Sequence, residues 1–379
     1  MNEIAPTPAP APIGFYMETA FHYQVYRSII TELLDRGFSC RLVISDGMPP
    51  ALLKDMQELL GKIDEPRLGA CLLSKSLTVG TPFSCLVSPY YAPGTDSLAP
   101  VHIRALYGLA KEQWNHAWWN VFYSKILCYS HYSQQALNIN GNAVAVGNPR
   151  FDAWHNQPDS LEGIEELNLD PQKPTLLYAP TFGSLSSIPH WAKQLERLGH
   201  DFNIITKLHH GTLCRPEEAT SLALARRHLR KRVKDHHLAF PALRVADYVL
   251  TDNSGFIFDA IHAGKRTILL SWDNMEALLE GQQTFSSQWS PDQKIRSLLP
   301  VAKNIEQLRE TLAAEEKWRA LESELELIRY QYCDAWQDGK AGKRAANVII
   351  EAITAPEPPE QNALLHSLRQ RLFAGNARG

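Results

Sequence analysis

The residues best suited to chemistry follow apolar, strand-length runs in the second half of the sequence. The run FNIITKLH (202–209) ends in Lys207 and His209, which together offer a positive, titratable pair. A histidine can donate a hydrogen bond to a phosphate or neutralise it near pH 7. A single histidine is more often structural, so a phosphate site is a hypothesis that depends on the neighbouring strand ends.

A second candidate lies within ADYVLTDNSGFIFDAIHAGKRTILL (246–270), where an apolar strand should end at a tight loop before a helix. The loop consists of Asp252, Asn253, Ser254 and Gly255. Such loops, followed by a helix N-terminus, bind phosphates at the carboxyl edge of parallel sheets. Ser254 can cap the helix or donate to a phosphate, and Gly255 lets a ligand approach the backbone. An ordinary helix cap is the alternative.

A third strand end has the same character. The run TLLYAPTFGS (175–184) leads into Thr181, Phe182 and Gly183. Thr181 can donate a hydrogen bond to a phosphate, and a turn or cap is its alternative role. Because the carboxyl ends of parallel strands meet at one edge of a sheet, the three segments should converge. Together they predict a site for the paired phosphates of a nucleotide-activated donor.

The elements that must position these residues form two α/β series. In the first, apolar runs at 13–17 and 41–45 flank a helical stretch from about His22 to Arg36, closed by Gly37. This strand–helix–strand order is typical of a parallel sheet. Further strands are expected at 124–130 and 143–149, around a helix near 133–137, and in the second half at 174–181, 202–209, 247–251 and 266–271.

The polar stretch 155–173 separates the two series and predicts the domain boundary. We expect a flexible lead-in at 1–12, a Rossmann-like acceptor domain at 13–158, a Rossmann-like donor domain at 159–340 and C-terminal helices at 341–379. The predicted fold class is therefore α/β, with two facing Rossmann-like domains and a C-terminal helical segment.

Composition narrows the classes of protein. A chain of 379 residues with 44% hydrophobic and 21% charged residues is long enough for two globular domains. A net charge of -3 without a basic stripe argues against a nucleic-acid partner. The six cysteines show neither paired nor zinc-ligand spacing, which predicts no metal site and a reducing compartment. Without a signal segment or an apolar run of about 20 residues, a cytoplasmic protein is expected.

Three further segments suggest partners. The basic run at 225–237 and the amphipathic tail NALLHSLRQRLFA (362–374) could touch the inner face of the cell membrane. Their alternatives are a solvated helix face for the run, and for the tail a helix packed on a domain or on a second copy in a homodimer. The aromatic segment NHAWWNVFY (115–123) could stack on a sugar or lipid acceptor, with core packing as the alternative.

The order of the motifs carries a resemblance. VGNPRFD (146–152), YAPTFG, KLHHG and the 246–265 segment together resemble the CDP-glycerol glycerophosphotransferase family of teichoic-acid and capsule polymerases, over roughly residues 100–275. That resemblance implies a GT-B fold and no essential metal or cofactor. It also implies that His209 contacts the donor phosphates, and that Thr181 and residues 252–255 line the same pocket. Arg150 and Asp152 would position the interdomain hinge.

The first domain departs from that family. The family carries a His-Gly motif, with a lysine soon after, that supplies the base for the acceptor hydroxyl. Here RALYGLAKEQW (104–114) places Tyr107 at the histidine position, while Gly108 and Lys111 remain. A tyrosine, with a reference pKa of about 10, is a poor base at neutral pH. The acceptor chemistry is therefore expected to differ.

Four residues are candidates for the replacement base. Glu18 and His22 rank first, because the carboxyl end of a first parallel strand faces the cleft. His102 and His116, close to the altered motif, rank second. A solvated or capping role is the alternative for each.

The sequence thus predicts a transferase. It would move a glycerophosphate or glycosyl group from a CDP- or UDP-type donor to a hydroxyl of a glycan or lipid-linked acceptor, in bacterial surface polysaccharide or teichoic-acid-like polymer synthesis. One alternative is a conventional metal-independent GT-B glycosyltransferase. Others are an isomerase of the UDP-sugar 2-epimerase type and a catalytically inactive nucleotide-binding subunit.

Overall fold

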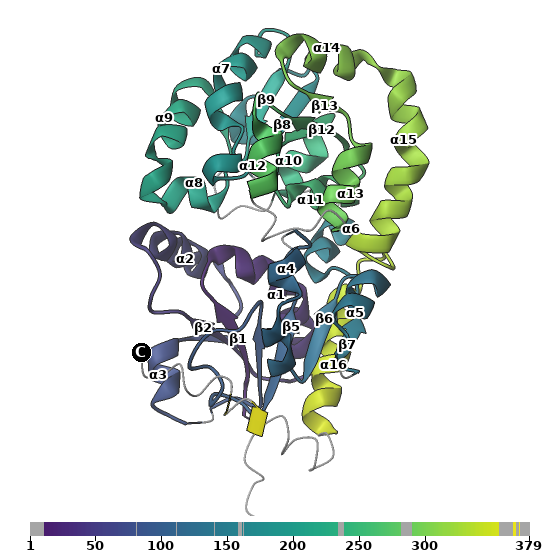
Figure 1. Cartoon of the computed structure of the whole chain (residues 1–379). Coiled ribbons are helices and arrows are strands. Elements are labelled where there is room, and N and C mark those ends of the chain that lie inside the picture. The colour runs from purple at the N-terminus through teal and green to yellow at the C-terminus, as the bar shows by residue number, and fades with distance from the viewer. Residues whose placement is uncertain are drawn as a thin grey trace, which may run out of the picture.

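The computed structural model shows two α/β lobes, each built on a parallel sheet (Figure 1). The structure describes residues 11–80, 82–110, 112–139, 141–157, 161, 163–233, 239–281, 290–355, 367–368 and 371. The predicted fold class, two Rossmann-like domains of GT-B type, is confirmed.

The first sheet has the strand order β3-β2-β1-β4-β5-β6-β7, and its neighbours pair in parallel. Its strands are β1 (Ile13–Met17), β2 (Cys40–Ile44), β3 (Leu68–Leu72), β4 (Cys85–Ser88), β5 (Val101–Ala105), β6 (Lys125–Cys128) and β7 (Ala143–Ala145). All five residues of β1 are buried, because helices cover both faces of the sheet. The predicted runs correspond to β1, β2, β6 and β7, whereas β3, β4 and β5 were missed.

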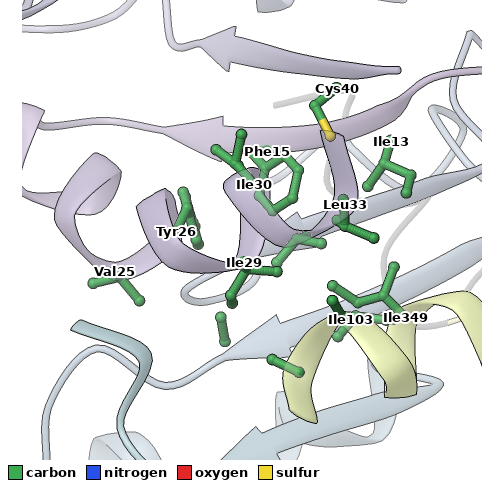
Figure 2. Close-up of a cluster of buried hydrophobic side chains, with 14 of the residues drawn as sticks. Ile13, Phe15, Val25, Tyr26, Ile29, Ile30, Leu33, Cys40, Ile103 and Ile349 are labelled. Atoms are coloured by element: carbon green, nitrogen blue, oxygen red, sulfur yellow. The ribbon is translucent and has the colours of Figure 1, made fainter. Parts of the chain in front are cut away.

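The helices of this lobe include α1, which begins near the predicted place. Their bounds are α1 (Ala20–Asp35), α2 (Pro50–Lys62), α3 (Leu73–Leu77), α4 (Glu112–Asn115), the 3-10 turn η1 (Trp118–Phe122) and α5 (His131–Leu137). Gly37 follows α1 with φ +84°, a left-handed conformation that suits glycine and ends the helix. The core between α1 and the sheet includes Phe15, Tyr26 and Ile29 (Figure 2).

The second sheet has the order β10-β9-β8-β11-β12-β13. Its strands are β8 (Thr175–Ala179), β9 (Asn203–Thr206), β10 (Lys231–Arg232), β11 (Tyr248–Thr251), β12 (Arg266–Leu270) and β13 (Val301–Ala302). Its helices are α7 (Ile188–Leu198), α8 (His210–Cys214), α9 (Ala219–His228), α10 (Phe240–Val245), α11 (Phe256–His262), α12 (Met275–Gly281), α13 (Pro291–Leu298), α14 (Ile305–Ala313) and α15 (Glu315–Ile328). Short turns η3 (Glu165–Leu167), η4 (Gly183–Leu185) and η5 (Pro216–Glu218) join them. All four strands predicted in this half are present.

The chain crosses between the lobes twice. It leaves the first lobe through η2 (Pro149–Phe151) and α6 (Asp152–Asn156), and it returns through the π-helical turn η6 (Arg329–Cys333). The final helix α16 (Ala341–Thr354) packs on α1, and its Ile349 lies in the first core (Figures 1 and 2). We predicted residues 341–379 as a separate helical segment, but α16 belongs to the first lobe because its small, apolar face is buried there.

The basic run and the tail are only partly visible. Residues 225–228 end α9, residues 231–232 form β10, and 234–237 lie outside the described residues, as does most of the 362–374 tail. In the part of the chain that the structure describes, no helix is long and apolar enough to cross a membrane.

Each sheet has one point where the strand order reverses direction. In the first sheet this point lies between β1 and β4, and in the second it lies between β8 and β11. Crevices outside the carboxyl ends of the strands at such a point are the usual ligand sites of open α/β sheets. The two crevices therefore define where the functional site should be sought.

Candidate functional site

The crevice between β8 and β11 is organised by one buried carboxylate. Asp252 follows β11 and is fully buried. Its Oδ1 accepts the N–H of Thr181 at 2.8 Å, and its Oδ2 accepts the N–H and hydroxyl of Ser187 at 2.8 and 2.7 Å. Burial raises the pKa of Asp252, although these hydrogen bonds act in the opposite direction. We predicted that Asp252 lines the pocket, but its side chain instead ties together the loops after β8 and β11.

The rest of the 252–255 loop is held at several points. The Asn253 side-chain amide donates to the carbonyl of Leu185 at 3.2 Å. The hydroxyl oxygen of Ser254 accepts the N–H of Phe256 at 3.2 Å, as a helix cap does, and its own proton remains suited to donate to a ligand. Arg296, which no sequence motif singles out, donates from its guanidinium to the Asp252 carbonyl at 2.7 Å. A charged hydrogen-bond donor on α13 thus holds the backbone of the 252–255 loop.

The end of β9 brings a histidine to the same edge. His209 Nδ1 accepts the N–H of Gly211 at 3.0 Å, so a neutral His209 carries its proton on Nε2. The His209 ring stacks on Phe182, with 4.5 Å between the ring centroids. The Arg215 guanidinium lies 4.6 Å from the centroid of the same Phe182 ring. Phe182 therefore links the loop after β8 to the loop after β9.

Lys207 and Gly183, which were also predicted to bind the donor, lie at the same sheet edge. The Lys207 N–H donates to the carbonyl of Tyr178 at 2.9 Å, which sets Lys207 directly after β9 beside β8. Gly183 has φ +77°, and its N–H donates to Glu218 Oε1 at 2.9 Å. Tyr178 also hydrogen-bonds Ser187 at 2.7 Å. Thr181, Phe182, Gly183, Lys207, His209 and residues 252–255 thus lie on one sheet edge.

The crevice of the first sheet is formed by the ends of β1, β4 and β5. Glu18, Tyr90 and Tyr107 each follow one of these adjacent strands. Glu18 Oε1 accepts the Tyr16 hydroxyl at 2.5 Å, and Glu18 Oε2 accepts the Tyr90 hydroxyl. Burial raises the pKa of Tyr107, so still less of its phenolate, the form able to accept a proton, is present at neutral pH. Tyr90 was missed because no strand was predicted at β4.

His22 lies behind this crevice. It is buried, its Nδ1 accepts the N–H of Glu18 at 3.2 Å, and its ring contacts those of Tyr90 and Tyr107 edge-on. Burial, assisted by the nearby His210, lowers the pKa of His22 to about 3. The imidazole is therefore neutral and weakly basic at neutral pH, which counts against His22 as the acceptor base.

Of the second-ranked candidates, His102 lies in the core, whereas His116 lines a small pocket with Gly108 of the altered motif. His102 is fully buried within β5, with Nε2 3.2 Å from the carbonyl of Asp96 and its ring against Phe122, so it belongs to the core and not to the crevice. His116 lies 3.8 Å from Glu112 on the segment after the altered motif, and burial lowers its pKa. Lys111 lies outside the described residues.

Contacts across the lobes bring the two crevices face to face. A Cβ added to Gly255 would lie 3.2 Å from the Cβ of Ala110, in the segment after Tyr107. His210 of the second lobe lies close enough to His22 of the first lobe to lower the pKa of His22. At the crossing, Arg150 forms an ion pair with Asp259, and Asp152 accepts the N–H groups of α16 at 2.7 and 2.9 Å. Arg150 and Asp152 thus lie at the crossing between the lobes, and their role in a hinge stays a prediction.

Comparisons with solved structures identify the fold. A structure of the wall teichoic acid polymerase TagF has a TM-score of 0.66 and 15% identity, covering 91% of this chain and 90% of that one. A variant of the same polymerase soaked with CDPG has a TM-score of 0.64 and 15% identity, with coverage of 91% and 90%. A putative UDP-N-acetylglucosamine 2-epimerase from Listeria monocytogenes has a TM-score of 0.57 and 14% identity, covering 93% and 98%. At these identities the likeness concerns the fold alone.

The sequence itself identifies the family. The comparison with curated proteins found no match. The profile described as CDP-Glycerol:Poly(glycerophosphate) glycerophosphotransferase, by contrast, matches residues 101–351, well over half of the chain. This match shows that the chain belongs to the CDP-glycerol:poly(glycerophosphate) glycerophosphotransferase family.

Proposed function

We propose that this protein transfers glycerophosphate from a CDP-glycerol-type donor to a hydroxyl acceptor in bacterial surface-polymer synthesis. The observation that carries the proposal is the 181–183 loop, which is bound to the 252–255 loop through Asp252 and to His209 through Phe182. The two loops and His209, which we propose to donate hydrogen bonds to the phosphates, are thereby held together at the reversal point of the second sheet.

The donor's paired phosphates would lie among Thr181, Ser254 and His209. In the reaction, the acceptor oxygen attacks the phosphorus of the glycerophosphate group, a new P–O bond forms, and the P–O bond to CMP breaks. Charge develops on the leaving CMP. The Nε2–H of His209 and the hydroxyl of Ser254 would stabilise that charge without a metal, as preorganised donors do.

On the acceptor side, Glu18 would take the proton of the attacking hydroxyl. It is the ionisable group at the end of β1, at the reversal point of the first sheet. The buried, neutral His22 orients it by accepting its N–H. This assignment replaces the histidine of the family motif, where Tyr107 stands here.

Isothermal titration with CDP, CDP-glycerol and UDP-N-acetylglucosamine tests the donor site. We expect CDP compounds to bind, and His209→Ala to weaken them by at least about tenfold, because a hydrogen bond to a charged group contributes about 1.5–3 kcal/mol. His200→Ala is the matched control, since that side chain is 93% exposed. Absence of nucleotide binding, or unchanged binding by both His209→Ala and Ser254→Ala, would overturn the proposal.

A further inference from the structure

The first-domain crevice contains a cluster of aromatic side chains around one carboxylate. The acceptor cluster, as we name it, consists of Glu18, His22, Tyr90, Tyr107 and Trp114. Three members follow adjacent strands at the reversal point, and Trp114 comes from α4. The cluster therefore occupies the position where this sheet would bind its ligand.

Tyr90 is the centre of the cluster. Its ring centroid lies 5.7 Å from that of His22, 5.8 Å from that of Tyr107 and 5.3 Å from that of Trp114, with the rings close to perpendicular. Tyr90, Tyr107 and Trp114 are half-buried, so each residue retains some exposed surface. Aromatic side chains combine a large apolar surface with a polar tip. They match a pyranose ring, which has a C–H face and a rim of hydroxyls.

Glu18 supplies the polar component of the cluster. Two phenol hydroxyls already donate to its carboxylate, those of Tyr16 and Tyr90, and they fix its orientation. An ionised carboxylate only accepts hydrogen bonds, and it has room for about four. It can therefore accept from a sugar hydroxyl, whereas it repels a phosphate.

None of the five members of the acceptor cluster is positively charged at neutral pH, and Lys111, between Tyr107 and Trp114 in the sequence, lies outside the described residues. His22 is neutral, with its pKa lowered to about 3 by burial. Beneath the cluster lies Arg104, which is fully buried and whose guanidinium donates to the carbonyls of Pro89 and Asn115 and to the side-chain oxygens of Asn115 and Asn120 at 2.7–3.0 Å. A polyanionic acceptor would require exposed cations to offset its phosphates.

We propose that this crevice binds the acceptor as a neutral saccharide and not as a polyanionic glycerophosphate chain. The inference rests on the proposed transfer function and names its acceptor class. Its two supports are the aromatic surface of Tyr90, Tyr107 and Trp114 and the negative charge of Glu18. The aromatic surface suits the C–H face of a pyranose, and the carboxylate suits its hydroxyls.

The test compares two kinds of acceptor with CDP-glycerol as donor. Methyl β-glycosides of glucose, galactose, N-acetylglucosamine and N-acetylmannosamine represent the saccharide, and a glycerophosphate trimer represents the polyanion. We expect at least one glycoside to be glycerophosphorylated, with a KM that changes less than twofold as salt rises. Trp114→Ala should raise that KM by about tenfold through lost ring contact. Trp336→Ala is the control, because that indole lies outside the acceptor cluster, where it contacts His131 and Arg344, and is 39% exposed.

Saturation-transfer NMR with the glycosides measures binding without turnover. Two outcomes would overturn the inference: the trimer as the better acceptor with a salt-dependent KM, or no glycoside signal together with wild-type behaviour of Trp114→Ala. Calorimetry with CDP separates this result from failure of the proposed function. A protein that binds CDP but no glycoside contradicts only the acceptor class, whereas a protein that binds glycosides but no nucleotide contradicts only the transfer function.

Discussion

Gly255 and Ala110 touch across the lobes, and a Cβ at position 255 would lie 3.2 Å from the Cβ of Ala110. The donor loop and the segment after Tyr107 therefore meet through two small residues. Because this contact sets how closely the two crevices approach, it links the fold to the chemistry.

Gly255→Leu should hold the lobes apart. We expect kcat/KM to fall by at least about tenfold, since small misplacements of reacting groups are costly, while the urea midpoint changes little. Gly61→Leu is the control, because Gly61 lies in α2 with no atom within 4 Å of an added Cβ. Equal kcat/KM values for the two variants would show that the contact does not control the approach of the lobes.

Asp252→Asn tests the buried carboxylate that joins two loops. The amide NH2 cannot accept from Thr181 or Ser187, so at least one backbone N–H loses its partner. We expect a loss of about 1–3 kcal/mol in the free energy of unfolding, together with weaker CDP binding. Asp170→Asn, at an exposed turn, is the comparison. Unchanged CDP affinity in Asp252→Asn would show that CDP binding does not depend on the link that Asp252 makes between the two loops.

The ion pair between Arg150 and Asp259 should stabilise the crossing between the lobes. Their side chains are 5% and 16% exposed, so Asp259→Asn leaves a buried guanidinium without its counter-charge. We expect a loss of about 3–5 kcal/mol in the free energy of unfolding, measured by urea denaturation. Removal of the exposed partner of Arg266 by Glu315→Gln should cost under about 1 kcal/mol. Similar losses of unfolding free energy in both variants would show that the buried ion pair stabilises the protein no more than the exposed one.

His22 should make the protein less stable in acid. Its pKa falls from 6.5 to about 3 on folding, so between these values the unfolded chain binds a proton that the folded chain does not. Stability from this residue is thus lost as pH falls from 6.5 towards 3, by up to about 1.4 kcal/mol per pH unit. His22→Gln should reduce the slope of unfolding free energy against pH, whereas the exposed His200→Gln should not. A slope unchanged by His22→Gln would mean that other groups control acid sensitivity.

The edge proposed to bind the donor could be predicted in large part because its strands lie in clearly apolar runs. Thr181, Lys207, His209 and Ser254 each follow a run that is readable from hydrophobicity alone, and parallel pairing then places them on one edge. The opposite edge, in the first sheet, was harder to predict from the sequence. β4 and β5 carry no clear pattern, so Tyr90 was missed and His102 was placed near the crevice when it lies inside β5.

By itself, the sequence determined the α/β class, the two sheets and the strand ends that bear polar groups, because hydrophobic runs and loop residues are local properties. Only the tertiary structure decided which of these groups are turned inward and where the last helix packs. Asp252 is turned inward by Thr181 and Ser187, His22 is buried behind Glu18, and α16 returns to the first lobe. Each of these outcomes depends on partners far away in the chain, and local patterns carry no information about such pairings.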